Sequence, residues 1–385
     1  MKVCFFTKEY PPQIYGGAGV HVKNLTRQLS RLIDVEVRCM GDQRSDEPQL
    51  AVHGFGAWNR MWEGHNPKFN SALGTFSTNL SMVRDAIDAD LVHSHTWYAA
   101  LSGYMAQQLY QVPYVATVHS LEPLRPWKEE QLGRSYHLTT WVEKVALEAA
   151  DRIVAVSNHA KGEILEHFDV DQRRIRVIHN GIDLDVWTPS ASQATRRAYE
   201  IEGPYILFVG RTSRQKGMVH LIDAMQHVDP GVRLVCCTSA PDTPEIEQEI
   251  AAKIAQQPRA LWINTMLRED QYIELYTHAS VFCCPSVYEP FGIINLEAMA
   301  CETPVVASAV GGIQEVVVDG TTGFQVPPGD AQALARRIND VLRDPALALR
   351  MGKAGRQRVV DHFSWASIAS KTLEMYQELV DEKKP

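Results

Sequence analysis

The chain has 385 residues, of which 45% are hydrophobic and 22% charged, and its formal net charge is -8. These are the proportions of a globular protein, and at about 150 residues per domain the length predicts two to three domains, with two as the working expectation. An acidic balance spread along the chain gives no electrostatic basis for binding nucleic acid. The first apolar run, residues 3–6, is too short for a signal peptide, and no apolar span reaches about 18 residues. We therefore expect a cytoplasmic protein with small-molecule partners.

Seven cysteines are present, an odd number, and six of them stand in apolar runs without the CxxC spacing of a metal site. This pattern is typical of buried, reduced thiols in a reducing compartment.

Short runs of β-branched and aromatic residues alternate along the chain with longer helical patterns. The first six are VCFFT, VEVRCM, DLVHSH, YVATVH, RIVAVS and IRVIHN; the next six are YILFVG, RLVCCT, ALWIN, SVFCCP, PVVASA and GFQVP. Near-continuous apolar strands separated by helices predict parallel sheets covered on both faces. The expected fold class is α/β, with two doubly wound, Rossmann-like domains facing across a cleft.

The polar segment 183–203 separates the two groups of strands, and we expect the domain boundary near residues 190 to 203. The predicted domains are 1–190 and 200–363, followed by an amphipathic terminal helix within 364–385 that crosses back to the first domain. A helix over 330–341 is expected to begin with Asp330 as its N-cap. Ligands of doubly wound sheets bind beyond the carboxyl ends of the strands, so residues directly after strands are the candidates for function.

A glycine-rich turn containing Gly16, Gly17 and Gly19 follows the first strand and precedes a helical pattern. Such a turn lets backbone N–H groups approach phosphate oxygens at a helix N-terminus. It equally suits a tight strand-to-helix connection without a ligand. The spacing is not GxGxxG and no acidic residue closes the second strand, which argues against a dehydrogenase.

Arg211 and Lys216 follow the first strand of the second group, and two cations there can offset the charge of a diphosphate leaving group. The alternative is a pair of solvated loop cations. His119 ends the fourth strand of the first group, where it can contact a sugar hydroxyl or serve only in packing.

Two glutamates, Glu289 on a turn and Glu297 in the next predicted helix, raise the question of a glycosidase-like pair. Eight residues of helix span roughly 12 Å, well beyond the about 5 Å of a retaining double displacement. We expect Glu297 to accept ribose hydroxyls, and Glu289 with the amides of 291–293 (Phe291, Gly292 and Ile293) to bind the transferred sugar. Exposed helix carboxylates are the alternative. No Asp-x-Asp pair follows a strand, so neither a metal nor a cofactor is expected to be required.

The motifs YGGAGVH, the histidine after the fourth strand, GRTSRQKG, Glu-x7-Glu and GGIQE occur in an order that strongly resembles a retaining GT-B glycosyltransferase of family 4, over nearly the whole chain. Within that family, KEYPPQIYGGAGVHV, HSLEPLRPWKEEQLG and the VPPGD turn are similar to the short, actinobacterial-type glycogen synthases that act as α-maltose-1-phosphate synthases. One departure is Glu302, where a glycine is more usual; that glycine is a packing feature, so the chemistry is not put in doubt.

The resemblance implies an N-terminal acceptor-side domain and a C-terminal nucleotide-sugar-binding domain. Its implied donor is ADP-glucose, with the diphosphate held by Arg211 and Lys216 and approached by the glycine turn. His119 and Glu289 would line the glucose, Glu297 the ribose, and anomeric configuration would be retained by front-face attack. The reaction implied is transfer to α-glucose-1-phosphate, to the end of an α-1,4-glucan, or to both, in glycogen or related α-glucan biosynthesis.

The acceptor-side candidates lie in the loop after His119: Arg125, Trp127, Lys128 and Arg134. They can bind a sugar phosphate through cations and a stacking ring, or form a solvated loop. A UDP-sugar-dependent transferase with another acceptor is the alternative enzyme. A nucleotide-sugar-binding regulatory module is the alternative outside enzymes, although every expected site residue is present. A homodimer would be ordinary for the family.

Overall fold

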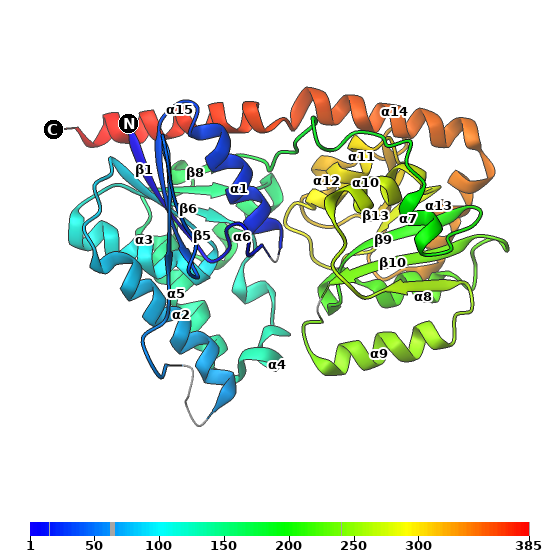
Figure 1. The fold of residues 1–385 in the computed structure, drawn as a ribbon, viewed down its shortest axis with the longest axis horizontal. Helices are drawn as coiled ribbons and strands as arrows, with labels where there is room; N and C mark the ends of the chain where they lie inside the picture. Colours follow the sequence, from blue (N-terminus) through cyan, green and yellow to red (C-terminus); the bar gives the residue numbers. More distant parts are fainter. Residues whose placement is uncertain (15, 62–65, 240, 385) are drawn as a thin grey trace. The chain divides into compact units, whose positions relative to one another are not determined.

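A computed structural model of the chain describes residues 1–14, 16–61, 66–239 and 241–384. The chain divides into two compact units (Figure 1): unit 1 comprises Met1–Asn180 and Trp365–Pro385, and unit 2 comprises Gly181–Ser364. The division thus lies after residue 180, earlier than the boundary expected near 190 to 203. The polar segment belongs to unit 2 because it is tied to a helix there: Ser192 Oγ donates to Glu274 Oε2 at 2.6 Å, and Arg196 N to Glu274 Oε1 at 2.8 Å.

Unit 1 is built on an eight-stranded sheet in the order β3-β4-β2-β1-β5-β6-β7-β8. All pairs are parallel except β3 with β4. The strands are β1 (Lys2–Thr7), β2 (Asp34–Met40), β3 (Arg44–Glu47), β4 (Leu50–Phe55), β5 (Leu91–His95), β6 (Tyr114–Val118), β7 (Arg152–Ala155) and β8 (Ile175–Val177). The six expected strands are all present. The β3–β4 hairpin extends one edge and was not predicted.

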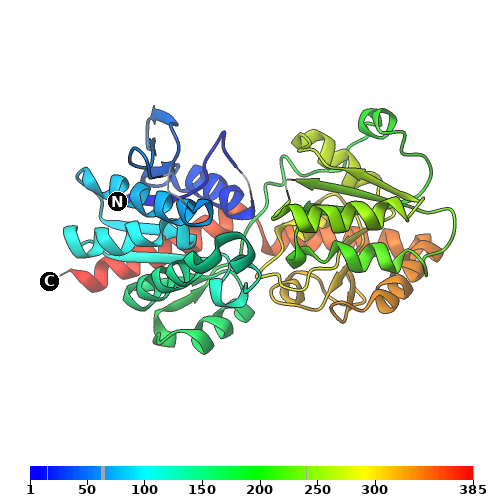
Figure 2. The ribbon, with the colours of Figure 1, turned by 90° about the horizontal axis from the view of Figure 1, so that it is seen from below.

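Helices cover both faces of this sheet. On one face α1 and α15 lie side by side in Figures 1 and 2 and enclose a core that includes Phe5, Leu25 and Tyr376. On the other face α3 packs against α2 and α5. The helices are α1 (Gly17–Leu29), α2 (Pro67–Arg84), α3 (Thr96–Tyr110), α4 (Lys128–Leu132), α5 (Tyr136–Ala149), α6 (Asn158–His167) and α15 (Trp365–Lys383).

Unit 2 contains a six-stranded, all-parallel sheet in the order β11-β10-β9-β12-β13-β14. The strands are β9 (Tyr205–Arg211), β10 (Arg233–Ser239), β11 (Ala260–Ile263), β12 (Val281–Cys284), β13 (Val305–Ser308) and β14 (Gly323–Val326). These are the six expected strands. The order reverses between β9 and β12, so the carboxyl ends of these two strands flank the switch point where doubly wound sheets bind ligands.

One face of the unit 2 sheet packs against α8, α9 and α13, and α10 and α11 lie on the other. The Asp330 side chain accepts from Ala333 N at 2.8 Å, which confirms the predicted N-cap. The helices are α7 (Ala194–Ala198), α8 (Met218–Ala224), α9 (Pro244–Ala255), α10 (Glu269–His278), α11 (Ile293–Ala300), α12 (Ile313–Val316), α13 (Ala331–Arg343) and α14 (Pro345–His362).

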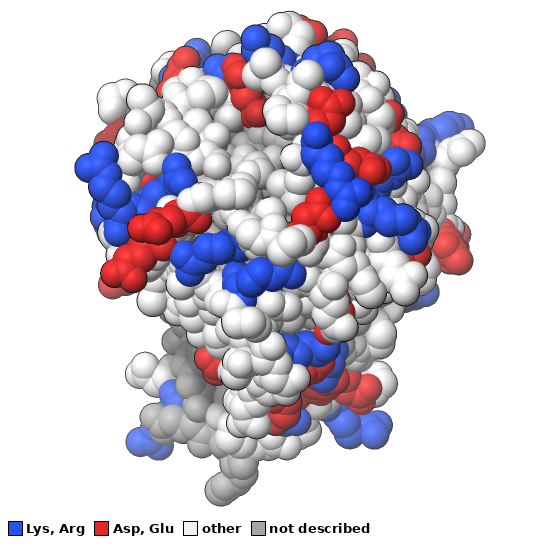
Figure 3. Space-filling view, turned by 90° about the vertical axis from the view of Figure 1, so that its right-hand side faces the viewer, with Lys and Arg blue, Asp and Glu red and all other residues white. Residues whose placement is uncertain are grey.

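All seven cysteines are free and buried, as expected for reduced thiols. Within the described parts of the chain, no helix combines the length and apolarity needed to cross a lipid bilayer. Figure 3 shows one face of the protein, on which acidic and basic side chains are interspersed rather than gathered by sign.

Candidate functional site

The loop after β9 carries the two predicted cations of unit 2. Arg211 is the last residue of the strand, and Lys216 ends the helical turn η4 (Arg214–Lys216). Lys216 folds back over the strand end, because a Cβ added at Gly210 would lie 3.6 Å from its Cγ. Both cations therefore stand at the carboxyl end of β9, beside the switch point.

Lys216 forms an ion pair with Glu289 in the loop after β12. Its Nζ lies 2.5 Å from Glu289 Oε2, and Ser286 Oγ donates to the same oxygen at 3.2 Å. Both partners are largely buried, with 14% of the Lys216 and 8% of the Glu289 side chain exposed. The two loops are also joined through their backbones, because Val287 N donates to Gln215 O at 2.9 Å. The structure thus brings two predicted site residues, 73 positions apart, into direct contact.

The Gly311-Gly312 turn after β13 packs against the backbone of the Glu289 loop. Gly312 N donates to Glu289 O at 3.0 Å. Gly311 has a φ of +52°, and a Cβ placed on it would lie 2.0 Å from Glu289 O. Only glycine fits this close approach of two backbones, which explains why the GGIQE motif accompanies the glutamate.

Glu297 lies on α11, and its Oε2 accepts a hydrogen bond from Tyr276 Oη at 3.0 Å. Burial raises the pKa of Glu297 to about 7; the Tyr276 hydrogen bond and the nearby Lys216 charge oppose the shift, and Glu269 adds to it. Lys216 therefore interacts electrostatically both with Glu297, the residue expected to bind the ribose, and with Glu289, the residue expected to bind the glucose. Phe291, Gly292 and Ile293 lie where the loop enters this helix, with Gly292 as its N-cap.

Arg211 pairs with Asp242, a residue that the sequence analysis did not select. Asp242 lies in the segment after β10, and its backbone N donates to Thr212 O at 3.0 Å. Only 17% of the Arg211 side chain is exposed. The carboxylate fixes the guanidinium at the strand end, so Arg211 is a positioned cation rather than a mobile loop residue.

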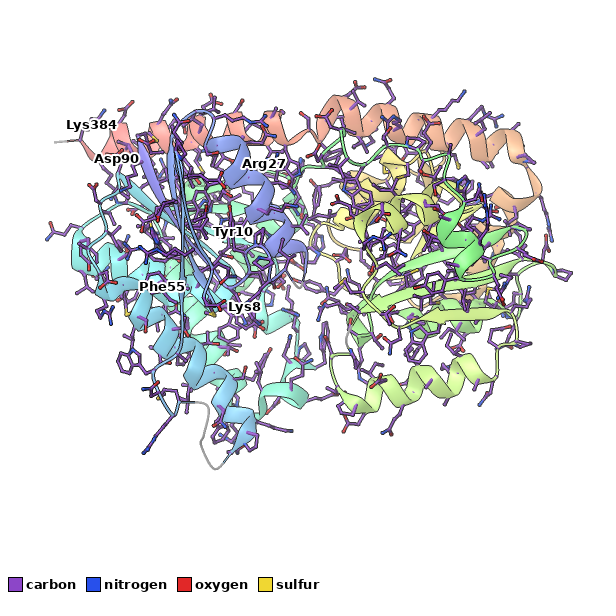
Figure 4. The ribbon with its side chains drawn as sticks, in the orientation of Figure 1. Lys8, Tyr10, Arg27, Phe55, Asp90 and Lys384 are labelled. Atoms are coloured by element: carbon purple, nitrogen blue, oxygen red, sulfur yellow. The ribbon has the colours of Figure 1, made fainter. Side chains whose placement is uncertain are left out.

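In unit 1 the glycine turn leads into α1, which begins at Gly17 with Gly16 as its N-cap. Glu9 fills the space beside it: Glu9 Oε2 accepts from Gly16 N at 2.8 Å, and a Cβ at Gly19 would lie 2.7 Å from the same oxygen. Gly19 is therefore required by packing as well as suited to a ligand. Lys8 precedes Glu9 and is labelled in Figure 4; its Nζ lies 3.9 Å from the centre of the Tyr98 ring. Tyr15, which opens the YGGAGVH motif, lies outside the described residues.

His119 follows β6 and contacts two histidines that the sequence analysis did not select. His95, the last residue of β5, places its Nδ1 3.0 Å from His119 Nε2. The ring of His21, on α1, lies 4.8 Å from that of His119 between centroids. Burial lowers the pKa of His21 to about 4 and the pKa values of His95 and His119 well below the usual value, so all three rings are neutral at physiological pH.

The candidate acceptor residues differ in exposure. Arg125 is buried and its Nη1 donates to Ser120 Oγ at 3.2 Å and to Glu122 Oε1 at 3.4 Å. Lys128, also buried, donates to Gln131 Oε1 at 2.8 Å. Trp127 is half-buried and Arg134 is exposed. Of the three predicted cations, Arg134 is thus the one that the surrounding chain leaves on the surface.

Two family models match the chain in succession: Glycosyltransferase Family 4 over residues 15–186, and Glycosyl transferases group 1 over residues 192–358. Alpha-maltose-1-phosphate synthase of Mycolicibacterium smegmatis is 46% identical, over 98% of this chain and 100% of that protein. The chain belongs to the family 4 glycosyltransferases. The expectation of a hexosyltransferase is thereby confirmed.

Further comparisons place this glycosyltransferase among enzymes of known fold. Glycogen synthase of Mycobacterium tuberculosis is 31% identical over 98% of this chain and 94% of that protein. Sucrose-phosphate synthase from Thermosynechococcus elongatus superposes with a TM-score of 0.83 and 26% identity, covering 99% of this chain and all of that one. Together with the two doubly wound units, these matches confirm the GT-B architecture.

Sequence reasoning missed the residues that position the predicted ones. Asp242 and Tyr276 lie 31 and 21 residues from their partners Arg211 and Glu297, in segments without a motif. Glu9 lies within the KEYPPQIYGGAGVHV motif, but its contact with Gly16 is not marked by any residue pattern. His95 had a signal, because it ends a predicted strand next to the one ending at His119, and parallel strands end at the same edge.

Proposed function

We propose that this glycosyltransferase transfers α-glucose from ADP-glucose to α-glucose-1-phosphate with retention of configuration, giving α-maltose-1-phosphate. The observation that carries the proposal is the 46% identity, across almost the whole chain, to a protein named alpha-maltose-1-phosphate synthase. The arrangement of part of the site supports it, since Arg211, Lys216 and Glu289 lie together at the carboxyl ends of β9 and β12 in unit 2.

In the proposed donor complex, Lys216 and Arg211 offset the charge that gathers on the diphosphate as it leaves. Lys216 then exchanges part of its contact with Glu289 for phosphate oxygens. Glu289, together with the amides at the start of α11, binds glucose hydroxyls, and Glu297 accepts hydrogen bonds from the ribose diol. His119 is proposed to contact the donor glucose from unit 1.

The chemical step breaks the bond between glucose C1 and the β-phosphate oxygen and forms a bond from C1 to an acceptor hydroxyl oxygen on the same face. The acceptor proton passes to the departing phosphate oxygen, so ADP leaves and no side chain forms a covalent bond. Catalysis then rests on positioning and on charge stabilisation, and the loss of one such charge commonly lowers kcat by about 10²–10³-fold. Because side-chain cations meet the developing negative charge, we propose that no metal ion or other cofactor is required.

Elongation of an α-1,4-glucan is a second candidate, favoured by the 31% identity to a glycogen synthase. A UDP-sugar donor is the further alternative. Initial rates on α-glucose-1-phosphate and on glycogen, each at equal ADP-glucose and then at equal UDP-glucose, separate these possibilities. We expect the highest rate with ADP-glucose and α-glucose-1-phosphate; faster transfer to glycogen, or from UDP-glucose, would overturn the corresponding part of the proposal.

A further inference from the structure

Three histidines from three separate elements of unit 1 converge beyond the carboxyl edge of its sheet. His21 lies on α1, His95 ends β5 and His119 follows β6. One ring nitrogen of each lies within 4.8 Å of those of the other two. The first two rings are buried, with 2% and 0% of the residue exposed, and the third is half-buried.

The contacts of His21 fix which of its nitrogens can act as a ligand. Its Nδ1 lies 2.6 Å from Asn180 Oδ1, an atom that only accepts hydrogen bonds, so Nδ1 carries the proton and Nε2 presents a lone pair. That Nε2 is buried and has no hydrogen-bond partner among the described residues. A metal-binding histidine is typically held in the same way, with its second ring nitrogen donating to an oxygen.

His95 and His119 supply the second and third nitrogens. Their facing atoms, Nδ1 and Nε2, lie 3.0 Å apart, close to the about 3.4 Å between two nitrogens bound to one tetrahedral zinc ion. The buried His21 Nε2 is costly to leave unpaired, and an ion bound beside the facing atoms of His95 and His119 would satisfy it.

We propose that His21, His95 and His119 form a binding site for one transition-metal ion of the Zn²⁺ or Co²⁺ kind. Three imidazoles with no carboxylate among them suit such borderline ions and disfavour Mg²⁺ and Ca²⁺, which take oxygen ligands. The longest separation must shorten on binding, and the half-buried His119 is the ring with the most freedom to turn. The proposed glucosyl transfer still requires no metal ion. An ion bound to His119 would instead block the proposed contact of this histidine with the donor glucose, and so compete with the donor.

The test is a titration of the full-length, untagged protein with Co²⁺, followed by absorption spectroscopy and equilibrium dialysis. We expect one saturable equivalent per chain with the ligand-field bands of a nitrogen-coordinated ion. His21→Gln and His95→Gln should each weaken binding at least about tenfold. The matched control is His159→Gln, because His159 is an exposed histidine 3.3 Å from Glu163 on α6 and represents adventitious surface binding. This variant should still bind one Co²⁺ per chain.

Several outcomes would overturn the site. These are the absence of saturable binding below about 1 mM, unchanged binding in folded His21→Gln and His95→Gln proteins, or loss of binding in the control alone. Thermal melts establish whether the variants fold. If they do not, X-ray absorption of the zinc-loaded wild-type protein decides: three imidazole nitrogens around the ion support the site, and fewer contradict it.

Discussion

Lys216 Nζ lies 2.5 Å from Glu289 Oε2, in a pair that joins the loop after β9 to the loop after β12 across the switch point of the unit 2 sheet. The pair is largely buried, so each charge is compensated by its partner rather than by water. Its consequence is that the cation expected to meet the donor diphosphate and the carboxylate expected to meet the glucose hold each other in place.

Replacing Lys216 with alanine should lower kcat by about 10²–10³-fold, because the charge that offsets the leaving diphosphate is removed. Steady-state rates with ADP-glucose and α-glucose-1-phosphate measure this. Arg214→Ala is the matched control: Arg214 lies two residues earlier, is exposed and pairs with Glu249 at 3.3 Å, so it should retain most activity. Near-normal turnover of Lys216→Ala would remove Lys216 from the site.

The same substitution should also destabilise the protein, because Glu289 is left as a buried charge without its partner, at a cost of about 3 kcal/mol or more. The double variant Lys216→Met with Glu289→Gln tests this, since it removes both charges. We expect its thermal midpoint to recover toward that of the wild type while activity stays low. A double variant as unstable as Lys216→Ala would contradict the account of the pair.

Gly311→Ala should displace the Glu289 loop, because the new Cβ would lie 2.0 Å from Glu289 O. The free energy of unfolding should fall by about 2 kcal/mol more than in Gly320→Ala. Gly320 is the control because its φ is also positive, at +72°, but nothing lies within 4 Å of the added carbon. Chemical denaturation of both variants measures the difference; equal losses would show that backbone strain alone matters there.

Glu297→Gln should stabilise the protein at alkaline pH. The pKa of Glu297 is raised from 4.5 to about 7 in the folded chain, so between these values the folded state keeps a proton that the unfolded state has lost. Stability conferred by this proton is therefore lost as the pH rises through that window, and above about pH 7 the glutamate is a half-buried charge. The neutral glutamine avoids this, with an expected gain on the order of 2 to 3 kcal/mol at pH 8 that vanishes below about pH 4.5.

Thermal melts of Glu297→Gln across that pH range check the sign, and Glu378→Gln is the control, since Glu378 forms an exposed pair with Arg176. Donor affinity should fall in Glu297→Gln while stability rises. A stability difference that does not change with pH would contradict the raised pKa of Glu297.

Arg134→Ala should raise the KM for α-glucose-1-phosphate by about tenfold, the effect of losing roughly 1.4 kcal/mol of phosphate contact. The KM for glycogen, which carries no such phosphate, should stay unchanged. Arg173→Ala is the control, because Arg173 is exposed and pairs with Asp171 at 2.5 Å. Equal effects of Arg134→Ala on both acceptors would exclude a phosphate-specific role.

The sequence predicted the fold to the level of strands because buried parallel strands read as continuous apolar runs. The β3–β4 hairpin escaped because RSDE is polar, lies at the edge and is largely exposed, so no apolar pattern marks it. The division between the units lies earlier than the expected boundary, since a polar composition does not reveal that Glu274 anchors residues 192 and 196.

In the site, the sequence predicted residues but not their contacts. Lys216 and Glu289 were both selected, yet their pairing depends on the β9–β12 adjacency, which no local pattern states. Asp242, 31 residues from Arg211, is fixed by the neighbouring strand β10 in the same way. Contacts between side chains that are distant in the sequence are therefore the features of the site that the structure was needed to show.

The most direct test of the central claim is to incubate the purified protein with ADP-glucose and α-glucose-1-phosphate and to identify the product by mass and by proton NMR of its anomeric signals. The proposed reaction predicts a disaccharide phosphate with a new α-linkage, formed in step with ADP. A β-linked product would contradict retention, and release of ADP with free glucose alone would contradict transfer to the sugar phosphate.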